Sequence, residues 1–387
     1  MRIALFTDTF PPEVNGVANS VAHIARSLST RGHLVRVYTV SKVRAEELER
    51  TSGGAFSVKV LPSMGLPIYL GVRVTAPFGF ALRDIRSFRP DIIHSHTPFS
   101  VGREAVIAAR KLQVPLIGTH HTFFNHYLKH VHLDYQWAQR LSWKLTVDYY
   151  NRCDLVISPT HSLADELKAH GLTKPCKIVQ NAIDTETFRP PETEEIKRQL
   201  KKKTGISDAS LVYMGRVSYE KSIDQLLKVV ALLVPQIPDV KLLVVGDGPE
   251  REKLEKLAQD LGIVERILFK GFLFGQDLVH TLQAGDVFVT ASKSENMPLA
   301  VLEAMACGLP VVTVTSLGLS EMVQDGANGY LLPPDDPERM AAEVVRLMKD
   351  DALRRGFAVR SREISLNYSD DAVMSCFEAV YESVRLR

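Results

Sequence analysis

Short runs of β-branched and other apolar residues alternate with helical patterns along the first half of the chain. The apolar run at residues 3–6 predicts a strand, and the apolar spacing over residues 17–31 predicts a helix that ends at Gly32. Further strands are predicted at 34–40, 92–94, 116–118, 155–157 and 177–179, and helices at 101–112 and 162–170. This alternation indicates a parallel sheet that is covered by helices on both faces.

Residues 189–207 interrupt the alternation. They begin Arg189-Pro190-Pro191 and continue through dense charge, which is typical of a linker. Strands are predicted again at 211–214, 241–245, 267–270, 287–290 and 311–314, with helices at 223–234, 251–261, 299–306 and 339–349. We therefore expect an α/β protein with two Rossmann-like doubly wound domains, 1–188 and 208–368, facing across a cleft, and a final helix at 369–387 that crosses back to the first domain.

Composition limits the class of protein. The chain has 387 residues, of which 45% are hydrophobic and 24% charged, as in a soluble globular protein with two domains. No uncharged apolar run of 18 residues occurs, so no transmembrane helix is predicted, and the first apolar run is too short for a signal peptide. The four cysteines are scattered without metal-like pairing, which favours a reduced, cytoplasmic protein.

Charge is distributed unevenly. Residues 1–185 carry 22 Lys and Arg against 14 Asp and Glu, whereas residues 186–387 carry 25 against 31. The first half therefore suits an anionic partner. The alternative is that the charges on the solvated surface are unevenly distributed by chance. The formal net charge of +2 gives no indication of nucleic acid, and none is expected as a partner.

Both tryptophans, Trp137 and Trp143, lie between residues 127 and 152 among several cations. Cations mixed with aromatic residues suit the surface of an anionic bilayer. An ordinary amphipathic helix packed on its own domain explains the pattern equally well. Association with the inner face of a membrane is therefore an open alternative for this region.

Two loops carry groups that suit phosphate. The loop Pro11-Pro12-Glu13-Val14-Asn15-Gly16 follows the first strand and ends where a helix begins, so backbone N–H groups near Gly16 could hold a phosphate, although a tight turn also explains it. Gly215, Arg216 and Lys221 follow the strand at 211–214. The guanidinium of Arg can donate two hydrogen bonds to phosphate oxygens, and the ammonium group of Lys adds a positive charge, so the two suit a diphosphate. The alternative is that both are ordinary exposed cations of the surface.

Two further strand ends could border a nucleotide. The strand at 241–245 is followed by Gly246-Asp247-Gly248-Pro249. This loop could bind a nucleotide, or it could simply connect a strand to a helix. Phe272 and Leu273 follow the next strand and could edge a base. Ligands of open α/β sheets bind beyond the carboxyl ends of the strands, which is why these loops are the candidates.

Two glutamates eight positions apart flank the start of a predicted helix. Glu295 precedes Pro298, and Glu303 lies inside the helix between Leu302 and Ala304. A buried helical Glu is uncommon unless it is hydrogen-bonded, and a sugar or ribose diol would satisfy both carboxylates. A phosphate would meet the free N–H groups of the helix's first turn.

Five of the twelve histidines follow the strand at 116–118: His120, His121, His126, His130 and His132. No carboxylate or thiol accompanies them at a matching spacing, so no metal site is predicted. A histidine at the strand end could instead orient a substrate or support charge in a transition state.

These residues together resemble the retaining nucleotide-sugar glycosyltransferases of family four, which have the GT-B fold. The resemblance covers nearly the whole chain. Its motifs are Asn15-Gly16, Asn181, Asp184, Gly215-Arg216, Lys221, Gly246-Asp247-Gly248-Pro249 and the pair Glu295 and Glu303.

Within that family the first half looks most like bacterial 1,2-diacylglycerol 3-glucosyltransferases and related lipid glycosyltransferases. The likeness rests on residues 94–99 (His-Ser-His-Thr-Pro-Phe), on Gly102 and on residues 119–122 (Thr-His-His-Thr). His121 matches the family's active-site His, because relatives usually have Tyr at the position of His120. Residues 296–298 (Asn-Met-Pro) differ from the Gly-containing tripeptide of close lipid glucosyltransferases, which leaves the sugar open.

The resemblance also implies roles for the residues. Arg216 and Lys221 would bind the donor diphosphate and neutralise the departing charge, and the backbone at Gly16 would approach it from the acceptor-binding first domain. Glu295 would hold sugar hydroxyls with the backbone around Met297, Pro298 and Leu299. Glu303 would accept hydrogen bonds from the ribose hydroxyls, His121 would contact the donor sugar, and Gly246, Gly248, Phe272 and Leu273 would border the nucleotide.

The implied reaction moves a hexose, with glucose expected, from UDP-glucose or another nucleotide diphosphate sugar to a lipid such as diacylglycerol, with retention. The chain has no Asp-x-Asp pair, the motif with which single-domain sugar-nucleotide enzymes hold a divalent cation. We therefore expect no metal and no cofactor besides the donor. The alternatives are a soluble transferase that uses, for example, GDP-mannose and a small-molecule or polysaccharide acceptor, and a non-hydrolysing sugar-nucleotide epimerase. The oligomeric state is left open.

Overall fold

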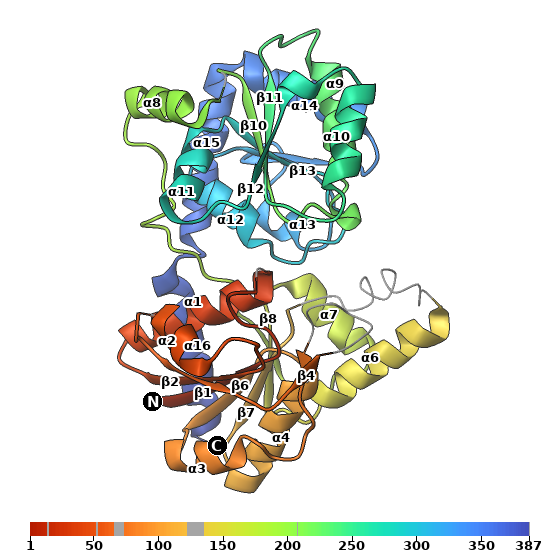
Figure 1. The fold of residues 1–387 in the computed structure, drawn as a ribbon. Coiled ribbons are helices and arrows are strands. Elements are labelled where there is room, and N and C mark those ends of the chain that lie inside the picture. The colour runs from red at the N-terminus through yellow and green to blue at the C-terminus, as the bar shows by residue number, and fades with distance from the viewer. Residues whose placement is uncertain (14, 52, 66–72, 122–134, 207, 387) are drawn as a thin grey trace. The chain divides into compact units, whose positions relative to one another are not determined.

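A computed structural model describes residues 1–13, 15–51, 53–65, 73–121, 135–206 and 208–386 (Figure 1). The chain forms two compact units. Unit 1 contains residues 1–182 together with 370–387, and unit 2 contains residues 183–369.

Unit 1 is built on a seven-stranded parallel sheet with the order β3-β2-β1-β6-β7-β8-β9. Its strands are β1 (Arg2–Thr7), β2 (Leu34–Thr39), β3 (Ser57–Val60), β6 (Ile92–Ser95), β7 (Leu116–Thr119), β8 (Leu155–Ser158) and β9 (Cys176–Ile178). β4 (Met64–Gly65) and β5 (Arg73–Val74) form a separate antiparallel pair. The strand order reverses between β1 and β6, the kind of position where ligands bind in open α/β sheets.

Helices cover this sheet: α1 (Gly16–Thr30), α2 (Ala45–Thr51), α3 (Leu82–Phe88), α4 (Ser100–Leu112), α6 (Gln136–Tyr150), α7 (His161–Ala169) and α16 (Asp370–Arg385). The last of these, α16, buries Phe377 and Tyr381 in the same apolar cluster as Ile3 and Leu5 of β1. Arg31 adds ion pairs from the end of α1 to Asp371, 2.8 Å away, and to Glu378, 3.0 Å away.

Unit 2 has a six-stranded parallel sheet with the order β12-β11-β10-β13-β14-β15. Its strands are β10 (Ser210–Met214), β11 (Lys241–Val245), β12 (Ile267–Gly271), β13 (Val287–Thr290), β14 (Val311–Val314) and β15 (Gly329–Leu332). The two parallel sheets agree with the predicted fold class. Here the strand order reverses between β10 and β13.

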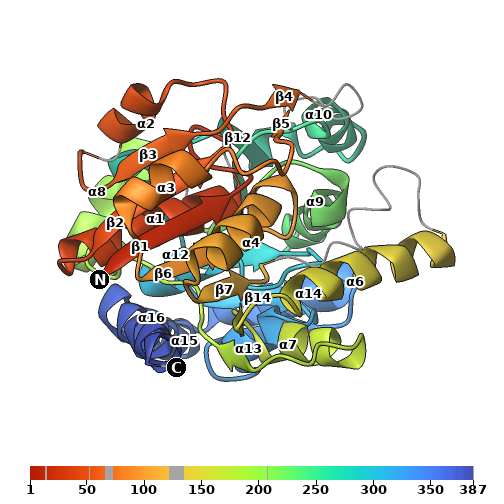
Figure 2. The ribbon, with the colours of Figure 1, turned by 90° about the horizontal axis from the view of Figure 1, so that it is seen from below.

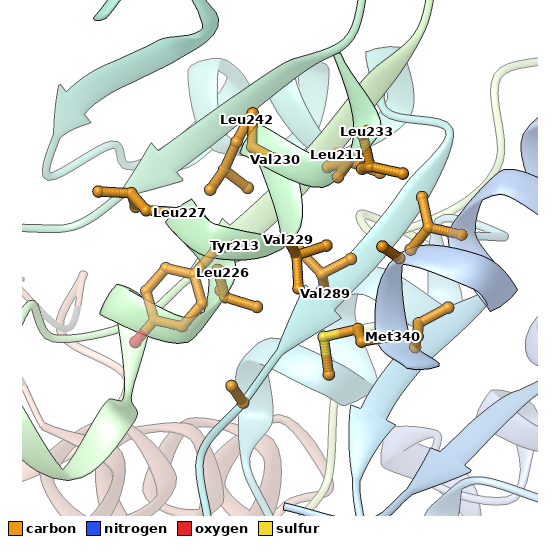
Figure 3. Packing of buried hydrophobic residues seen from close by; sticks show 14 of the residues in the cluster. Leu211, Tyr213, Leu226, Leu227, Val229, Val230, Leu233, Leu242, Val289 and Met340 are labelled. Atoms are coloured by element: carbon orange, nitrogen blue, oxygen red, sulfur yellow. The ribbon is translucent and has the colours of Figure 1, made fainter. Parts of the chain in front are cut away.

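The helices of unit 2 are α8 (Glu194–Thr204), α9 (Ile223–Leu233), α10 (Arg251–Asp260), α11 (Gly275–Ala284), α12 (Leu299–Ala306), α13 (Leu319–Met322), α14 (Pro337–Lys349) and α15 (Asp351–Leu366). One core lies between the sheet and α9, where Leu211 and Tyr213 of β10 pack with Leu226 and Val230 of the helix (Figure 3). These strands carry apolar residues at successive positions because both of their faces are buried.

The stretch expected as a linker, 189–207, contains the helix α8. Thr193 caps its start by accepting a hydrogen bond from the backbone N–H of Ile196, and Gly205 ends it in the left-handed conformation. Lys201 of α8 reaches the buried carboxylate of Asp286, 2.5 Å away, so α8 is fastened to the body of unit 2.

No helix in the described part of the chain is both long and apolar enough to cross a bilayer.

Candidate active site

The loops that follow β10 and β13 meet at the point where the strand order of unit 2 reverses. Lys221 comes from a short 3-10 turn, Tyr219–Lys221, after β10, and Glu295 comes from the loop after β13. The Nζ atom of Lys221 donates to Oε1 of Glu295 across 2.5 Å, and both side chains are mostly buried. The structure thus brings together two of the predicted site residues that lie 74 positions apart.

Arg216 precedes this pair in the same loop. Arg216 is exposed, and within the described part of the chain its guanidinium forms no ion pair or hydrogen bond. Gly215, beside it, has φ +158, a conformation that residues with a side chain rarely adopt, and a Cβ atom there would lie 2.8 Å from the hydroxyl oxygen of Tyr213. A guanidinium held near the carboxyl end of a central strand is placed to bind phosphate oxygens.

The glycines after β11 serve the packing of two loops. A Cβ atom at Gly246, whose φ is +127, would lie 2.0 Å from the carbonyl oxygen of Gly215. A Cβ atom at Gly248 would lie 2.3 Å from the carbonyl oxygen of Val217. The backbone N–H of Val217 donates to the carbonyl oxygen of Asp247 over 3.0 Å. Gly246 and Gly248 therefore allow the β11 loop to support the loop that carries Arg216.

Glu303 lies in the second turn of α12, and its carboxyl group has no hydrogen bond among the described residues. Burial without compensating hydrogen bonds raises the pKa of Glu303 to about 8. A carboxyl group that lacks a partner in a folded protein is placed to receive one from a ligand. Ribose hydroxyls are donors of the required kind.

The turn that leads into α12 is held by unit 2 itself. Pro298 is the N-cap of α12 in an extended conformation, and Met297 is buried in the apolar cluster beneath the helix. The backbone N–H of Gly318 donates to the carbonyl oxygen of Glu295, and a Cβ atom at Gly318 would lie 1.2 Å from the carbonyl oxygen of Asn296. The N–H groups of Val301 and Leu302 donate to the carbonyl oxygen of Pro298, so those of Leu299 and Ala300 are the ones at the helix start that can bind an anion.

Phe272 and Leu273 differ in their surroundings. Phe272 is half exposed and stacks on Phe274, with ring centroids 6.4 Å apart. The side chain of Leu273 instead packs against the apolar cluster under α12. Of the two predicted residues, Phe272 therefore offers an aromatic face at the surface of this loop and Leu273 does not; the neighbouring Phe274 is exposed as well.

Unit 1, taken by itself, has candidate groups at the carboxyl ends of β1, β6 and β7. Gly16 is the first residue of α1, capped by Asn15, and a Cβ atom there would meet nothing within 4 Å. His121 follows β7, and its Nε2 atom lies 3.0 Å from Nδ1 of His96, which follows β6. Burial lowers the pKa of His121 to about 4, so this imidazole is neutral at pH 7.

Three further residues support these groups, and of these the sequence reasoning named only His96, as part of the motif at residues 94–99. His96 contacts His121, and Gly318 holds the turn at Glu295. Asp8 follows β1 and accepts hydrogen bonds from Ser100 Oγ at 2.5 Å and from the Val101 N–H at 3.0 Å, which joins β1 to the start of α4. The signal that could have found Asp8 is an acid directly after a central strand.

The two tryptophans of the basic region have different environments. Trp143 is buried and stacks on His170 with ring centroids 4.1 Å apart, so it belongs to the packing of unit 1. Trp137 is 62% exposed. His126, His130 and His132 lie outside the described residues, and within the described ranges no group of three or more potential ligands could hold a metal ion.

Comparison with known proteins identifies the family. Residues 14–187 match the family described as Glycosyltransferase Family 4, and residues 192–364 match glycosyl transferases group 1. An alpha-monoglucosyldiacylglycerol synthase from Streptococcus pneumoniae is 30% identical over 86% of this chain and 75% of its own length. The chain is a family 4 glycosyltransferase. It is a retaining enzyme, as the motifs predicted.

One further relative and one solved structure extend the comparison. A GDP-mannose-dependent alpha-mannosyltransferase from Corynebacterium glutamicum is 28% identical over 91% of this chain and 81% of its own length. The Anabaena protein HepE, solved in complex with UDP, superposes with a TM-score of 0.82 at 19% identity, over 99% of this chain and 100% of HepE. The structural match confirms the GT-B fold of the glycosyltransferase.

Proposed function

We propose that this glycosyltransferase moves glucose from UDP-glucose to a lipid acceptor such as diacylglycerol, without a metal ion. The observation that carries the donor part is the Lys221–Glu295 pair at the strand reversal of unit 2, with Arg216 beside it. Arg216 and Lys221 stabilise the diphosphate as it leaves, Glu295 holds hydroxyls of the sugar, and Glu303 accepts hydrogen bonds from the ribose.

The chemical step breaks the bond between the anomeric carbon and the diphosphate oxygen. The acceptor hydroxyl oxygen forms its bond to the same face of that carbon, so the configuration is retained. The acceptor's proton passes to the departing diphosphate, which carries the negative charge that develops. Fixed cations and the first N–H groups of α12 meet that charge in place of a metal ion.

The surface of α6 supports a lipid acceptor. Trp137, Leu141 and Leu145 are spaced four residues apart and are all exposed, so they form one apolar stripe along this helix. Arg140 and Lys144 lie beside the stripe and are exposed as well. Figures 1 and 2 both show α6, coloured yellow, extending outward from the sheet of unit 1. This combination suits docking on an anionic bilayer.

The relatives bear on the acceptor and the donor. The name of the Streptococcus pneumoniae relative states a glucosyldiacylglycerol product, and it supports glucose and a lipid. The Corynebacterium glutamicum relative supports the second candidate, transfer of mannose from GDP-mannose. The epimerase alternative is set aside because the chain belongs to the transferases. The same proposal places the enzyme in the cytoplasm, on the inner face of a membrane.

A donor and acceptor panel tests the proposal. The purified chain is incubated with UDP-glucose, UDP-galactose or GDP-mannose, with and without diacylglycerol in anionic mixed micelles, and nucleoside diphosphate release and glycolipid formation are measured. Of the three donors, we expect only UDP-glucose to give glycolipid. The rate should be the same with and without excess chelator. A Glu295→Gln preparation is the control for contaminating activity.

Other outcomes would contradict particular parts of the proposal. Glycolipid from GDP-mannose alone would replace the donor, and transfer only to soluble saccharides would remove the lipid acceptor. Loss of activity in chelator that Mg²⁺ or Mn²⁺ restores would overturn the metal-independent step.

A further inference from the structure

His96 and His121 form a direct contact between two imidazole rings at the carboxyl edge of the unit 1 sheet. His96 Nδ1 lies 3.0 Å from His121 Nε2, and the ring planes are 25° apart. His96 is only 1% exposed. Because β6 and β7 are neighbouring parallel strands, the residues that follow them are brought together at the same edge.

Both rings are neutral at physiological pH. Burial lowers the pKa of His121 to about 4, and burial together with the nearby His94 ring lowers the pKa of His96 well below its usual range. The ring centroids of His94 and His96 are 4.1 Å apart. In a contact between two neutral imidazoles, one ring must donate an N–H and the other must accept it.

The surroundings of His96 decide the direction of this hydrogen bond. Among the described residues, the buried Nε2 atom of His96 has no hydrogen-bond partner. If His121 donated, His96 would carry its proton on Nε2 and would bury an N–H without an acceptor. If His96 donates from Nδ1, only a lone pair is left at Nε2, and buried N–H groups without partners are rarer than under-used acceptors.

We propose that His96 is a positioning residue that donates to His121 and thereby fixes His121 as the Nδ1–H tautomer. His121 then acts as a neutral hydrogen-bond donor to an oxygen of the donor sugar, and it does not transfer a proton. The functional part of this inference rests on the proposed function and on the sugar contact that the family resemblance implies for His121. The tautomer itself depends only on the geometry of unit 1.

Nitrogen NMR of the full chain with ¹⁵N-labelled histidine tests the tautomer directly. The His121 signals are assigned by their loss in His121→Gln. We expect a protonated Nδ1 and an unprotonated Nε2 for His121 at pH 7, and no change of this pattern down to pH 6. A His121 that is protonated on Nε2 would overturn the proposal, whatever the activity of the enzyme.

Two variants at position 96 separate positioning from packing. Phe in His96→Phe fills similar space without a donor, so His121 should become a mixture of tautomers and kcat/KM should fall at least ten-fold. The side-chain amide of His96→Asn can place a donor near the position of Nδ1, so the wild-type NMR pattern and at least a third of the activity should return. His280→Phe replaces a histidine of the other unit and is the control, which should change neither.

The readouts distinguish failure of this inference from failure of the proposed function. A wild-type His121 tautomer that persists in His96→Phe would contradict the positioning role, and a circular-dichroism melt shows whether that variant is folded. If the tautomer shifts as expected but His121→Gln retains full activity, the sugar contact is wrong while the assignment of the hydrogen bond stands.

Discussion

The Nζ atom of Lys221 lies 2.5 Å from Oε1 of Glu295, which links the loops after β10 and β13 in unit 2. The cation is thereby held at the strand reversal, where a ligand of an open α/β sheet binds. In the function that we propose, Glu295 orients Lys221 before the donor binds, so little reorganisation is needed when the diphosphate departs.

Removal of the Lys221 charge should slow the transfer. In Lys221→Met we expect kcat to fall about 100- to 1000-fold, because the leaving diphosphate loses a fixed cation and Glu295 keeps an unpaired charge. Initial rates with saturating donor measure this. Lys228→Met, in the following helix α9, removes an exposed cation and should leave kcat within two-fold. Equal losses in the two variants would show that Lys221 has no special role.

Binding of UDP should release a proton from Glu303. Because the pKa of this buried carboxyl is raised to about 8, it is mostly protonated at pH 7, whereas the ribose hydroxyls bind best to its carboxylate form. Affinity should therefore increase as the pH rises from 7 to above 8. Calorimetry of UDP binding in two buffers with different ionisation enthalpies measures the proton. Glu303→Gln should abolish the release, and a wild-type enzyme that releases no proton would exclude this linkage.

The same carboxyl should make the fold less stable in alkaline buffer. The folded-state pKa of Glu303 is raised, so its neutral form is favoured by folding, and this contribution is lost as the pH rises from about 4.5 through 8. Relative to wild type, Glu303→Gln should therefore gain melting temperature between pH 6 and pH 9. Thermal melts across this range measure the difference. A difference that does not vary with pH would mean that Glu303 titrates near its usual value.

A side chain at Gly248 should damage the loop that carries Arg216. In Gly248→Ala the new Cβ atom would lie 2.3 Å from the carbonyl oxygen of Val217, which must move. We expect a loss of about 1–3 kcal/mol in the free energy of unfolding and a higher donor KM. Urea titration and kinetics measure both. Gly356→Ala, in α15 with nothing within 4 Å, should be up to about 1 kcal/mol more stable than wild type.

The exposed stripe of α6 should mediate binding to anionic vesicles. Trp137→Ser with Leu141→Ser should weaken sedimentation with phosphatidylglycerol vesicles at least ten-fold, because apolar area is lost at the interface. Arg140→Gln with Lys144→Gln should weaken binding at low salt and make the remaining binding less sensitive to added salt, because the attraction that salt screens is lost. Leu232→Ser, on an exposed site of α9 in unit 2, is the control. Indifference of the wild-type protein to anionic and neutral vesicles would exclude this surface.

The central strands were the most predictable part of the fold. The apolar run predicted at residues 3–6 is β1, and the run predicted at 287–290 is β13, since strands buried on both faces carry continuous apolar sequence. The edge strand β3, with its exposed Lys59, and the helix α8, which is dense in charge, were not predicted. Their polar residues face solvent, so their apolar pattern is weak, although the Thr193 cap and Gly205 mark the ends of α8.

By itself, the sequence determined the alternation of strands and helices, the two doubly wound domains and the ordered motifs that indicate the family. Only the tertiary structure decided which of those residues meet. Lys221 and Glu295 are 74 positions apart, and His96 and His121 are 25 apart, so parallel strand pairing and not local sequence brings them together. The protonation states of Glu303 and His121 also belong to the folded state, because burial withdraws these groups from water and disfavours their charged forms.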